Sequence, residues 1–202
     1  MQFLTSFFTA ALAAIFIENT IFTRALGTSR LVAVVKSPKT MLKFGTMLTA
    51  ITTVAGFLSW AVNLALAKLS FKLYFEPLVN VLVLVFVFIA ASLVLFFAFP
   101  KTYRKMSEIL LLSVFNCASL GAILLPAHNS LLSVEASLPT WVGFSFGTGV
   151  AFFLASVLVF EGTRKLKESH VPVPFRGFPA TLIYIGILSL AFYGLIGHEL
   201  PF

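Results

Sequence analysis

The chain has 202 residues, of which 59% are hydrophobic and only 10% are charged, and its mean hydropathy is +1.04. Soluble domains carry about 25% charged residues, and a soluble fold this apolar would expose large apolar patches and aggregate. The net charge of +7 does not indicate nucleic-acid binding, because the basic residues lie between apolar runs and form no continuous patch. An integral membrane protein with a single domain, residues 1–202, is therefore predicted.

Six apolar runs reach or approach the roughly 20 residues that an α-helix needs to cross the hydrocarbon core of a bilayer. The first run begins near the N-terminus, where residues 1–5 contain no Lys or Arg, so a retained span is expected rather than a cleavable signal. Helices are expected because lipid offers no partners to unpaired backbone groups. The sequence thus predicts an all-α fold with six transmembrane helices, at about 3–23, 44–67, 78–99, 109–125, 141–160 and 178–197.

Twelve of the fourteen basic residues lie in the first, third and fifth connections between these runs. The second connection holds the other two, Lys68 and Lys72. Because positive charge marks the cytoplasmic side, both termini are expected outside, and the second three-helix half would be inverted relative to the first. The twelve residues are Arg24, Arg30, Lys36, Lys39, Lys43, Lys101, Arg104, Lys105, Arg164, Lys165, Lys167 and Arg176.

The two halves share a short pattern in their first spans. Asn19 is followed by Leu26-Gly27 in the first span, and Asn116 is followed by Leu120-Gly121 in the fourth. Inverted-repeat transporters place broken helices at corresponding positions of their halves. The pattern therefore predicts that the first and fourth helices are broken near these residues.

Glu18 is a carboxylate next to Asn19 within the first apolar run. An ionised carboxylate inside a membrane needs a partner, a cation or water. One interpretation is a pathway for ions or protons at the predicted helix breaks. The other is that the span ends early and that Glu18 pairs near the inner interface with Arg24 or another base.

Cys117 is the only cysteine and follows Asn116 in the fourth run. One interpretation is a small buried hydrophobic side chain, as free cysteines often are. The other is a thiolate ligand of a metal centre, with Asn116 and nearby backbone groups tuning it. Iron–sulfur clusters normally need four ligands, mostly cysteines, so this chain cannot build one alone.

The fifth connection ends in a rigid segment, residues 171–177. Pro172 and Pro174 fix φ at two positions, and Gly177 permits a turn. Arg176 then follows Phe175 at the inner mouth of the sixth span. The segment is either a stiff turn with an interfacial arginine, or a docking surface for a cytoplasmic partner or a brace between the halves.

Small residues in the fifth run, Gly143-x-x-x-Gly147, allow helices to approach closely. The sequence contains no Gly-rich phosphate loop, no zinc-ligand spacing and no nucleophile elbow. Helix packing is therefore the role expected of these glycines.

Three motifs together resemble the small membrane subunits of the Rnf/Nqr family, which belong to bacterial ion-translocating oxidoreductases. The first is Phe16-Ile17-Glu18-Asn19 with Leu26-Gly27, and the second is Asn116-Cys117-Ala118 with Leu120-Gly121. The resemblance runs nearly from end to end and is greatest for the A subunit of Rnf and the equivalent E subunit of Nqr. The third motif is a carboxy-terminal block of residues 171–177, Gly186, Ser189-Leu190-Ala191-Phe192 and Gly194.

The resemblance implies a location in the bacterial cytoplasmic (inner) membrane and pairing with a homologous subunit of opposite topology, alongside other subunits of a complex. In the family, each member of that pair gives two cysteines to a shared [2Fe-2S] cluster, which passes electrons across the membrane while Na⁺ or H⁺ is moved. Cys117 would then be a cluster ligand. The chain would be a subunit of a translocase without catalysis of its own.

The sequence departs from the family pattern at two positions. The family's first motif ends in Leu-Gly-x-Cys, whereas this chain has Ser29 at the position of the missing ligand cysteine. A serine hydroxyl is a harder ligand and loses its proton far less readily than a thiol, so a cluster here would be weaker or absent. The family also carries a Glu late in the third span, where this chain has Ser92.

Two functions are consistent with these residues. The first is a membrane subunit of an Rnf/Nqr-like complex that supports transmembrane electron transfer coupled to Na⁺ or H⁺ transport. The second is a diverged paralogue without redox function, acting as a small transporter or as a scaffold for other membrane subunits. Iron and sulfide shared with a homologous subunit would favour the first.

Overall fold

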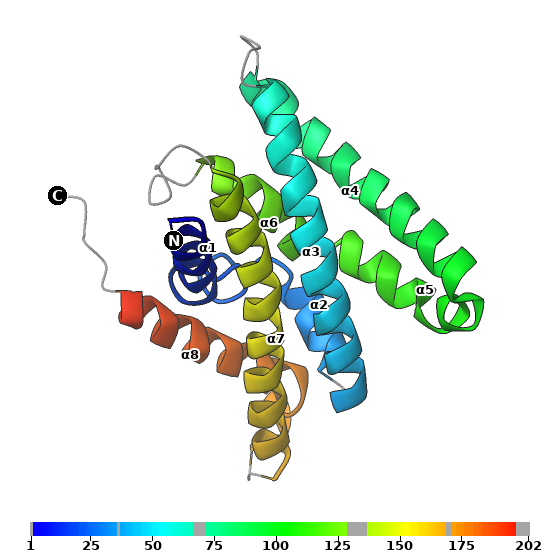
Figure 1. Cartoon of the computed structure of the whole chain (residues 1–202). Helices are drawn as coiled ribbons and strands as arrows, with labels where there is room; N and C mark the ends of the chain where they lie inside the picture. Colours follow the sequence, from blue (N-terminus) through cyan, green and yellow to red (C-terminus); the bar gives the residue numbers. More distant parts are fainter. Residues whose placement is uncertain (1, 36, 67–71, 129–136, 169–170, 197–202) are drawn as a thin grey trace, which may run out of the picture.

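The computed structural model describes residues 2–35, 37–66, 72–128, 137–168 and 171–196 (Figure 1). No strand occurs in these ranges, and the all-α prediction is confirmed. In chain order the elements are α1 Gln2–Leu12, the π-helix η1 Ala13–Ile17, α2 Thr28–Val34, α3 Pro38–Leu66, α4 Lys72–Ala98, α5 Pro100–Val114, α6 Cys117–His128, α7 Leu138–Glu168, the 3-10 helix η3 Val173–Phe175 and α8 Phe178–Ile196.

Four of these helices, α3, α4, α7 and α8, are long and apolar enough to cross a membrane. A fifth crossing is made if α5 and α6 count as one span, because Met106–Val114 and Cys117–Pro126 meet at a bend of 40°. The first predicted span is shorter in the structure, because the apolar helix Gln2–Ile17 ends where an irregular loop begins. The described residues thus contain up to five crossings, against six predicted. The predicted ends near 67 and 197 and the middle of the connection 126–140 lie outside the described residues.

The third predicted connection is helical rather than a loop. Only Phe99 separates α4 from α5, which begins at Pro100. Proline suits the first turn of a helix because its φ is already helical and its missing N–H would have no intrahelical partner there. Lys101 and Arg104, which were expected in a loop, therefore lie in the first turns of α5.

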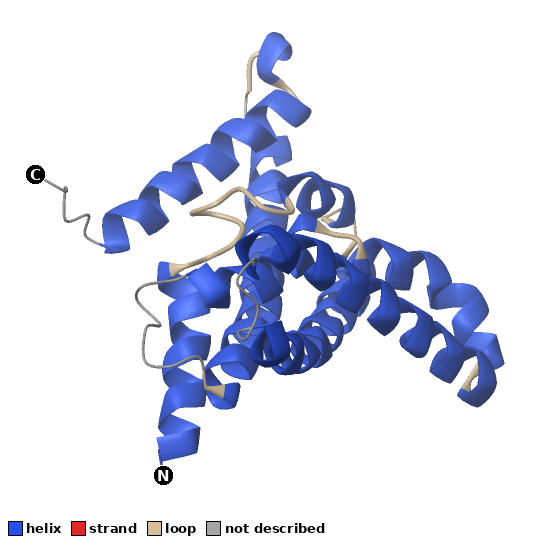
Figure 2. Ribbon diagram, turned by 90° about the horizontal axis from the view of Figure 1, so that it is seen from above, coloured by secondary structure: helices blue, strands red, loops and turns tan. Residues whose placement is uncertain are grey.

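Helices α3 and α7 form the centre of the molecule, and the other elements pack around them (Figures 1 and 2). Helix α7 contacts α1, η1, α2, α3, α6 and α8, whereas α3 also contacts α4, α5 and α6. In the most apolar 18-residue stretch of α7, 61% is buried. The corresponding stretch is 17% buried in α4 and only 6% buried in α8. Helices α4 and α8, which project from the centre, therefore expose most of their apolar surface.

Glycines on α7 allow α1 to approach closely. A methyl group on Gly143 would contact the carbonyl oxygen of Phe7, and one on Gly147 would lie 2.5 Å from the carbonyl oxygen of Ala11. Helix backbones that approach this closely need residues without a Cβ. The packing role predicted for Gly143-x-x-x-Gly147 is confirmed.

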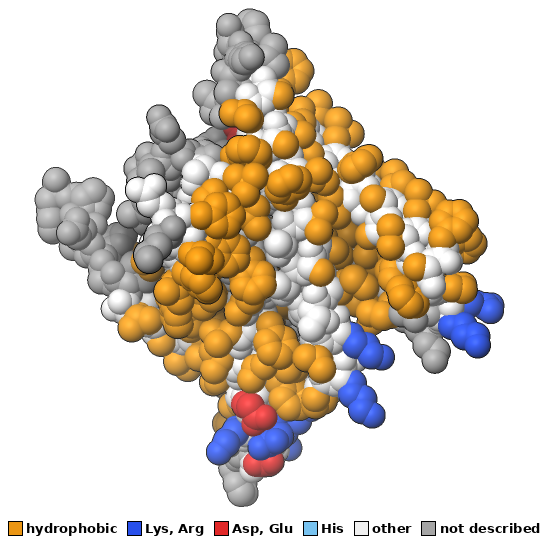
Figure 3. All heavy atoms as spheres, in the orientation of Figure 1, with side chains coloured by type: hydrophobic (Ala, Val, Ile, Leu, Met, Phe, Trp, Pro, Cys, Tyr) orange, Lys and Arg blue, Asp and Glu red, His pale blue; other side chains and the backbone are white. Residues whose placement is uncertain are grey.

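The surface is apolar along the helices and charged at one end (Figure 3). Lys and Arg side chains gather at the lower end of the face shown, where α7 ends, α3 begins and α4 meets α5. Continuous apolar surface of this kind marks contact with lipid or with other membrane proteins. Exposed apolar side chains on α4 and α8 include Phe86, Val94, Ile187 and Leu190.

Candidate functional site

The first helix is interrupted by a loop that Asn19 stabilises. Helix η1 ends at Ile17, and Asn19 is fully buried in the turn that follows. Its Oδ1 accepts hydrogen bonds from the N–H groups of Ile21 (3.0 Å) and Phe22 (3.1 Å), and its Nδ2 donates to the carbonyl of Ile15 (2.8 Å). These bonds satisfy backbone groups that lose their partners where the helix ends. Asn19 thus joins the end of the helix to the loop.

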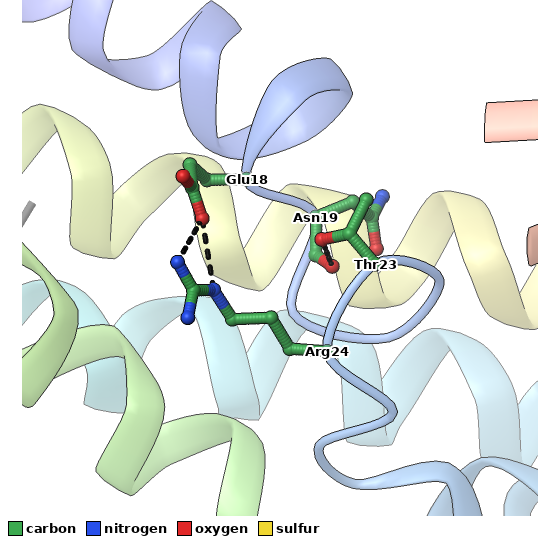
Figure 4. Close-up of polar contacts among 4 residues, drawn as sticks. All are labelled: Glu18, Asn19, Thr23 and Arg24. Atoms are coloured by element: carbon green, nitrogen blue, oxygen red, sulfur yellow. Dashed lines mark hydrogen bonds and ion pairs between the residues drawn. The ribbon is translucent and has the colours of Figure 1, made fainter. Parts of the chain in front are cut away.

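Glu18 forms an ion pair with Arg24 across the same loop (Figure 4). Glu18 Oε2 lies 2.6 Å from Arg24 Nη2 and 2.8 Å from Arg24 Nε. The Glu18 side chain is 14% exposed and that of Arg24 is 42% exposed. Thr23 also closes the loop, because its Oγ1 donates to the carbonyl of Asn19 (2.6 Å). The pairing with Arg24 that one interpretation of Glu18 predicted is present in the structure.

Glu18→Gln is expected to lower the free energy of unfolding by about 1 kcal/mol or less, because ion pairs with an exposed partner contribute little. Thermal unfolding of Glu18→Gln, Arg24→Gln and the double variant in one detergent measures the coupling. Glu161→Gln on α7 is the control, since Glu161 pairs with Arg164 at 3.2 Å on a more exposed surface. This substitution should lower the free energy of unfolding less than Glu18→Gln does. A double variant whose loss equals the sum of the single losses would contradict a contribution from the pair.

The second break separates α5 from α6 at Phe115 and Asn116. Ser119 Oγ donates across it to the carbonyl of Ser113 (2.6 Å). In a continuous helix that carbonyl would accept the N–H of residue 117 instead. Asn116 Oδ1 accepts a longer hydrogen bond from the N–H of Ala118 (3.4 Å). Side chains thus compensate for backbone bonds lost at the break.

The two breaks meet inside the molecule. Gly27, the residue before α2, has a φ of 85° and lies against the second break. A methyl group on Gly27 would lie 3.0 Å from Asn116 Oδ1 and 3.1 Å from Ala118 Cβ. One on Gly121 would lie 2.8 Å from Leu26 Cδ1. The predicted residues Gly27, Asn116 and Gly121, which are far apart in the sequence, thus lie in one contact region between the two halves.

Three polar side-chain atoms near the breaks are buried without a hydrogen-bond partner among the described residues: Thr20 Oγ1, Ser113 Oγ and Asn116 Nδ2. Thr20 belongs to the first loop, and the other two residues flank the second break. A buried polar atom left without a partner costs roughly 1–3 kcal/mol. Polar groups retained at such a position in a membrane protein typically line sites for water, protons or cations.

Cys117 and Ser29 stand at the start of the short helices that follow the breaks. Cys117 is the first residue of α6 and Ser29 is the second of α2. Both residues are exposed, so the interpretation of Cys117 as a buried hydrophobic residue is wrong. Across the described ranges, no group of three or more His, Cys, Asp or Glu side chains could hold a metal ion. One thiol and one hydroxyl are fewer than the four ligands of a [2Fe-2S] cluster, so these residues could hold such a cluster only together with ligands from another subunit.

The segment 171–177 lies on the surface, in a turn that packs beside the end of α7. Arg176 Nε donates to the carbonyl of Val171 (2.8 Å), and Gly177 has a φ of 86° where the chain turns into α8. A cavity of about 270 Å³ lies between the segment and the end of α7. The exposed residues of the segment are Pro172, Val173, Pro174, Phe175, Arg176 and Gly177.

Residues 7–198 match the pattern of the family described as "Rnf-Nqr subunit, membrane protein". The chain belongs to the Rnf-Nqr family. The A subunit of the ion-translocating oxidoreductase complex of Photorhabdus laumondii is 29% identical over 194 residues, which are 96% of this chain and 98% of that relative. The protein of the same name from Pectobacterium carotovorum is 30% identical over 90% of this chain and 91% of its own length. That from Proteus mirabilis is 28% identical over 96% of this chain and 98% of its own length.

Membership of the Rnf-Nqr family confirms the resemblance that the three motifs indicated. The first two motifs lie at the two helix breaks, and the third covers the exposed segment 171–177 and parts of α8. The chain is therefore a multi-pass membrane protein in which the first two motifs lie at breaks between helices.

The sequence reasoning missed a second buried polar cluster. Glu76 on α4 is 1% exposed and lies one turn before Asn80, which is fully buried. Ser59 and Asn63 have the same spacing on α3 and are 0% and 5% exposed. The predicted third span begins at residue 78, which leaves Glu76 in a connection. A repeated polar i, i+4 spacing on consecutive helices was the signal, because it puts each pair on one helix face.

Proposed function

We propose that this chain is a membrane subunit of an Rnf/Nqr-like ion-translocating electron transport complex in the cytoplasmic (inner) membrane of a bacterium. The observation that carries the proposal is the family match over residues 7–198, together with relatives that are named as the A subunit of an ion-translocating oxidoreductase complex. Within the complex the chain supports electron transfer coupled to transport of Na⁺ or H⁺. It has no catalytic activity on its own.

The proposal includes six spans in two inverted halves of one domain, residues 1–202, with both termini on the outer side. The helix contacts support this. The first span of each half packs on the middle span of the other half: α1 and η1 pack on α7, and α5 and α6 pack on α3. The last span of each half packs on the middle span of its own half: α4 packs on α3, and α8 packs on α7. Exchanging the halves leaves this pattern unchanged, as expected for repeats related by an axis in the membrane plane. The basic side chains gathered at one end (Figure 3) support the orientation.

The proposed ion pathway passes the region where the two breaks meet. Gly27, Asn116 and Gly121 lie in this region, and the proposed pathway also includes Glu18 and Asn19 of the loop at the first break. Irregular backbone is tolerated at membrane depth only where it is buried in protein or lines a cavity that water can enter. The buried polar atoms without partners near the breaks support a path that a cation or proton could follow.

The proposed partner is a homologous membrane subunit of opposite topology. The exposed positions of Cys117 and Ser29 suit a contact with that subunit, and the exposed segment with Pro172, Phe175 and Arg176 suits docking of another subunit. Ser29 leaves this chain's half of the cluster ligands incomplete. That substitution favours a second candidate function, a paralogue without redox activity that serves as a small transporter or as a membrane scaffold.

Ser29→Cys is expected to raise the iron and sulfide content of the complex with the homologous subunit, because a thiol supplies the thiolate that such clusters bind. Wild type and Ser29→Cys are each co-expressed with the homologous subunit of the same organism and gently solubilised. Their iron and sulfide contents and their EPR spectra are then compared. Cys117→Ser is the matched control and should lower the content, since it removes the remaining thiol. Co-purification without iron in all three proteins would favour the scaffold, and failure to co-purify would contradict membership of such a complex.

A further inference from the structure

A cavity of about 270 Å³ lies where the end of α7, the segment 171–177 and the start of α8 meet. Two of the side chains that line it are cationic, Lys167 from α7 and Arg176 from the segment, and none of its lining residues in the described part of the chain is acidic. Ligand pockets usually have volumes of about 300–1,000 Å³, so this cavity has room for a small group rather than for a large cofactor. Its charge and its size together suit a small anionic group.

Neither cation is neutralised by another described side chain. Arg176 Nε donates to the carbonyl of Val171 (2.8 Å), which positions the guanidinium, and its two Nη atoms have no partner within the described residues. Lys167 likewise pairs with no residue that the structure describes. Of the acids near the end of α7, Glu161 pairs with an arginine of the same helix at 3.2 Å, and Glu168 is exposed and does not line the cavity. The cavity thus carries two positive charges that are available to a ligand.

The cavity lies at the level where a membrane protein meets lipid headgroups. It is formed at the end of α7, where basic side chains gather (Figure 3), and α8 leads away from it as an apolar helix whose most apolar stretch is only 6% buried. Phe178 and Leu182 in the first turns of α8 are exposed, and Leu166 and Val171 line the cavity beside the cations. Acyl chains attached to a group in the cavity would therefore lie against apolar surface, which a free inorganic anion would not use.

We propose that this cavity binds the phosphate group of an anionic phospholipid between Lys167 and Arg176, with the acyl chains against α8. Guanidinium donors match phosphate oxygens in pairs, and a lysine ammonium adds a second positive charge. Basic pockets between helices on the cytoplasmic side, to which the proposed orientation assigns this end, bind such headgroups. The hydroxyls of Thr163 and Thr181 also line the cavity, but they donate to carbonyls of the chain at 2.9 and 3.1 Å, so recognition depends on the two cations.

The charges that line the cavity favour an anionic headgroup over a zwitterionic one. The headgroup of phosphatidylcholine carries an ammonium group, which would lie close to Lys167 and Arg176 with no carboxylate among the described lining residues to balance it. The headgroup of phosphatidylglycerol brings no positive charge. The docking proposed for Pro172 and Phe175 uses residues outside the lining, so it is compatible with a bound lipid.

Lipid-dependent stabilisation of the isolated full chain tests the proposal. Thermal unfolding is followed by tryptophan fluorescence in an uncharged detergent, and phosphatidylglycerol replaces phosphatidylcholine of the same acyl chains stepwise at constant total lipid, pH and ionic strength. Because a ligand that binds only the folded chain raises Tm with a saturable dependence on its concentration, phosphatidylglycerol should do so in the wild type. Inorganic phosphate, added at the same concentrations in a parallel series, should raise Tm far less because it has no acyl chains.

Arg176→Gln and Lys167→Gln should each raise the half-saturating phosphatidylglycerol concentration roughly fivefold, the factor expected for one cation beside an anionic lipid. Both residues are exposed, so neither substitution should prevent folding. Lys43→Gln is the matched control, because it removes one positive charge at the same end of the molecule from an exposed position on α3 that does not line the cavity. It should keep the wild-type response.

The proposal is overturned if phosphatidylglycerol and phosphatidylcholine give the same Tm. It also fails if Lys43→Gln shifts the response as much as the two cavity variants, since that would identify diffuse attraction to the basic end. Stabilisation by inorganic phosphate at the same concentrations would replace the lipid by a free anion. If the lipids do not differ and the cavity variants instead lose other subunits on purification, the cavity holds an acidic segment of a partner. The lipid measurements use the isolated chain, so their outcome does not depend on the proposed electron-transport function.

Discussion

Gly147→Ala is expected to lower the free energy of unfolding by about 2–4 kcal/mol, the upper range for overpacking of a well-packed contact. The added methyl group would lie 2.5 Å from the carbonyl oxygen of Ala11, 2.8 Å from its Cα and 2.9 Å from Ala14 Cβ. Two of these atoms belong to the backbone, so no side chain can rotate away and α1 must move as a whole. Thermal unfolding in detergent should show a Tm lower by roughly 5–15 °C, from about 2–4 °C per kcal/mol for a chain of this length.

Gly186→Ala is the matched control, because it makes the same change in an apolar helix where nothing lies within 4 Å of the added methyl group. Alanine is favoured over glycine in a helix by about 0.5–1 kcal/mol, so this variant should be neutral or slightly more stable. An equal fall in the free energy of unfolding of the two variants would contradict the close contact of α1 with α7. A loss in Gly147→Ala alone would show that the first helix is held mainly by this glycine face.

The long helices were predictable because runs of apolar residues with few charges have little alternative to a helix in lipid. The last span, expected at 178–197, is α8 Phe178–Ile196. The irregular first loop could be expected only in outline, because its shape depends on bonds that one side chain makes. The bonds of Asn19 to Ile21, Phe22 and Ile15 decide where the helix ends, and spacing in the sequence does not specify them.

The residue types of the candidate site were predictable, but their pairings were not. Glu18, Asn116 and Gly121 stood out because polar or flexible residues are unusual in apolar runs. The ion pair of Glu18 depended on whether Arg24 folds back across the loop, which only the structure shows. Glu76 was missed because a boundary set by hydropathy excluded it, although α4 begins four residues earlier, at Lys72.

Gly27→Ala is expected to lower the free energy of unfolding by about 2–4 kcal/mol, from a left-handed backbone and a close contact together. The φ of 85° costs a residue with a Cβ about 1–2 kcal/mol. The new methyl group would also lie 3.0 Å from Asn116 Oδ1 and 3.1 Å from Ala118 Cβ, so the second break must shift by a few tenths of an ångström. Thermal unfolding in detergent measures the loss.

Gly177→Ala separates these two causes, because Gly177 has nearly the same φ, 86°, with nothing within 4 Å of an added methyl group. Its free energy of unfolding should fall only by the cost of the left-handed backbone, about 1–2 kcal/mol. The difference between the two variants then measures the contact between the breaks of the two halves. If the two losses are equal, the breaks do not support each other. If Gly27→Ala loses clearly more, the breaks are coupled mechanically, and a shift of the loop before Ser29 must also displace the backbone beside Cys117.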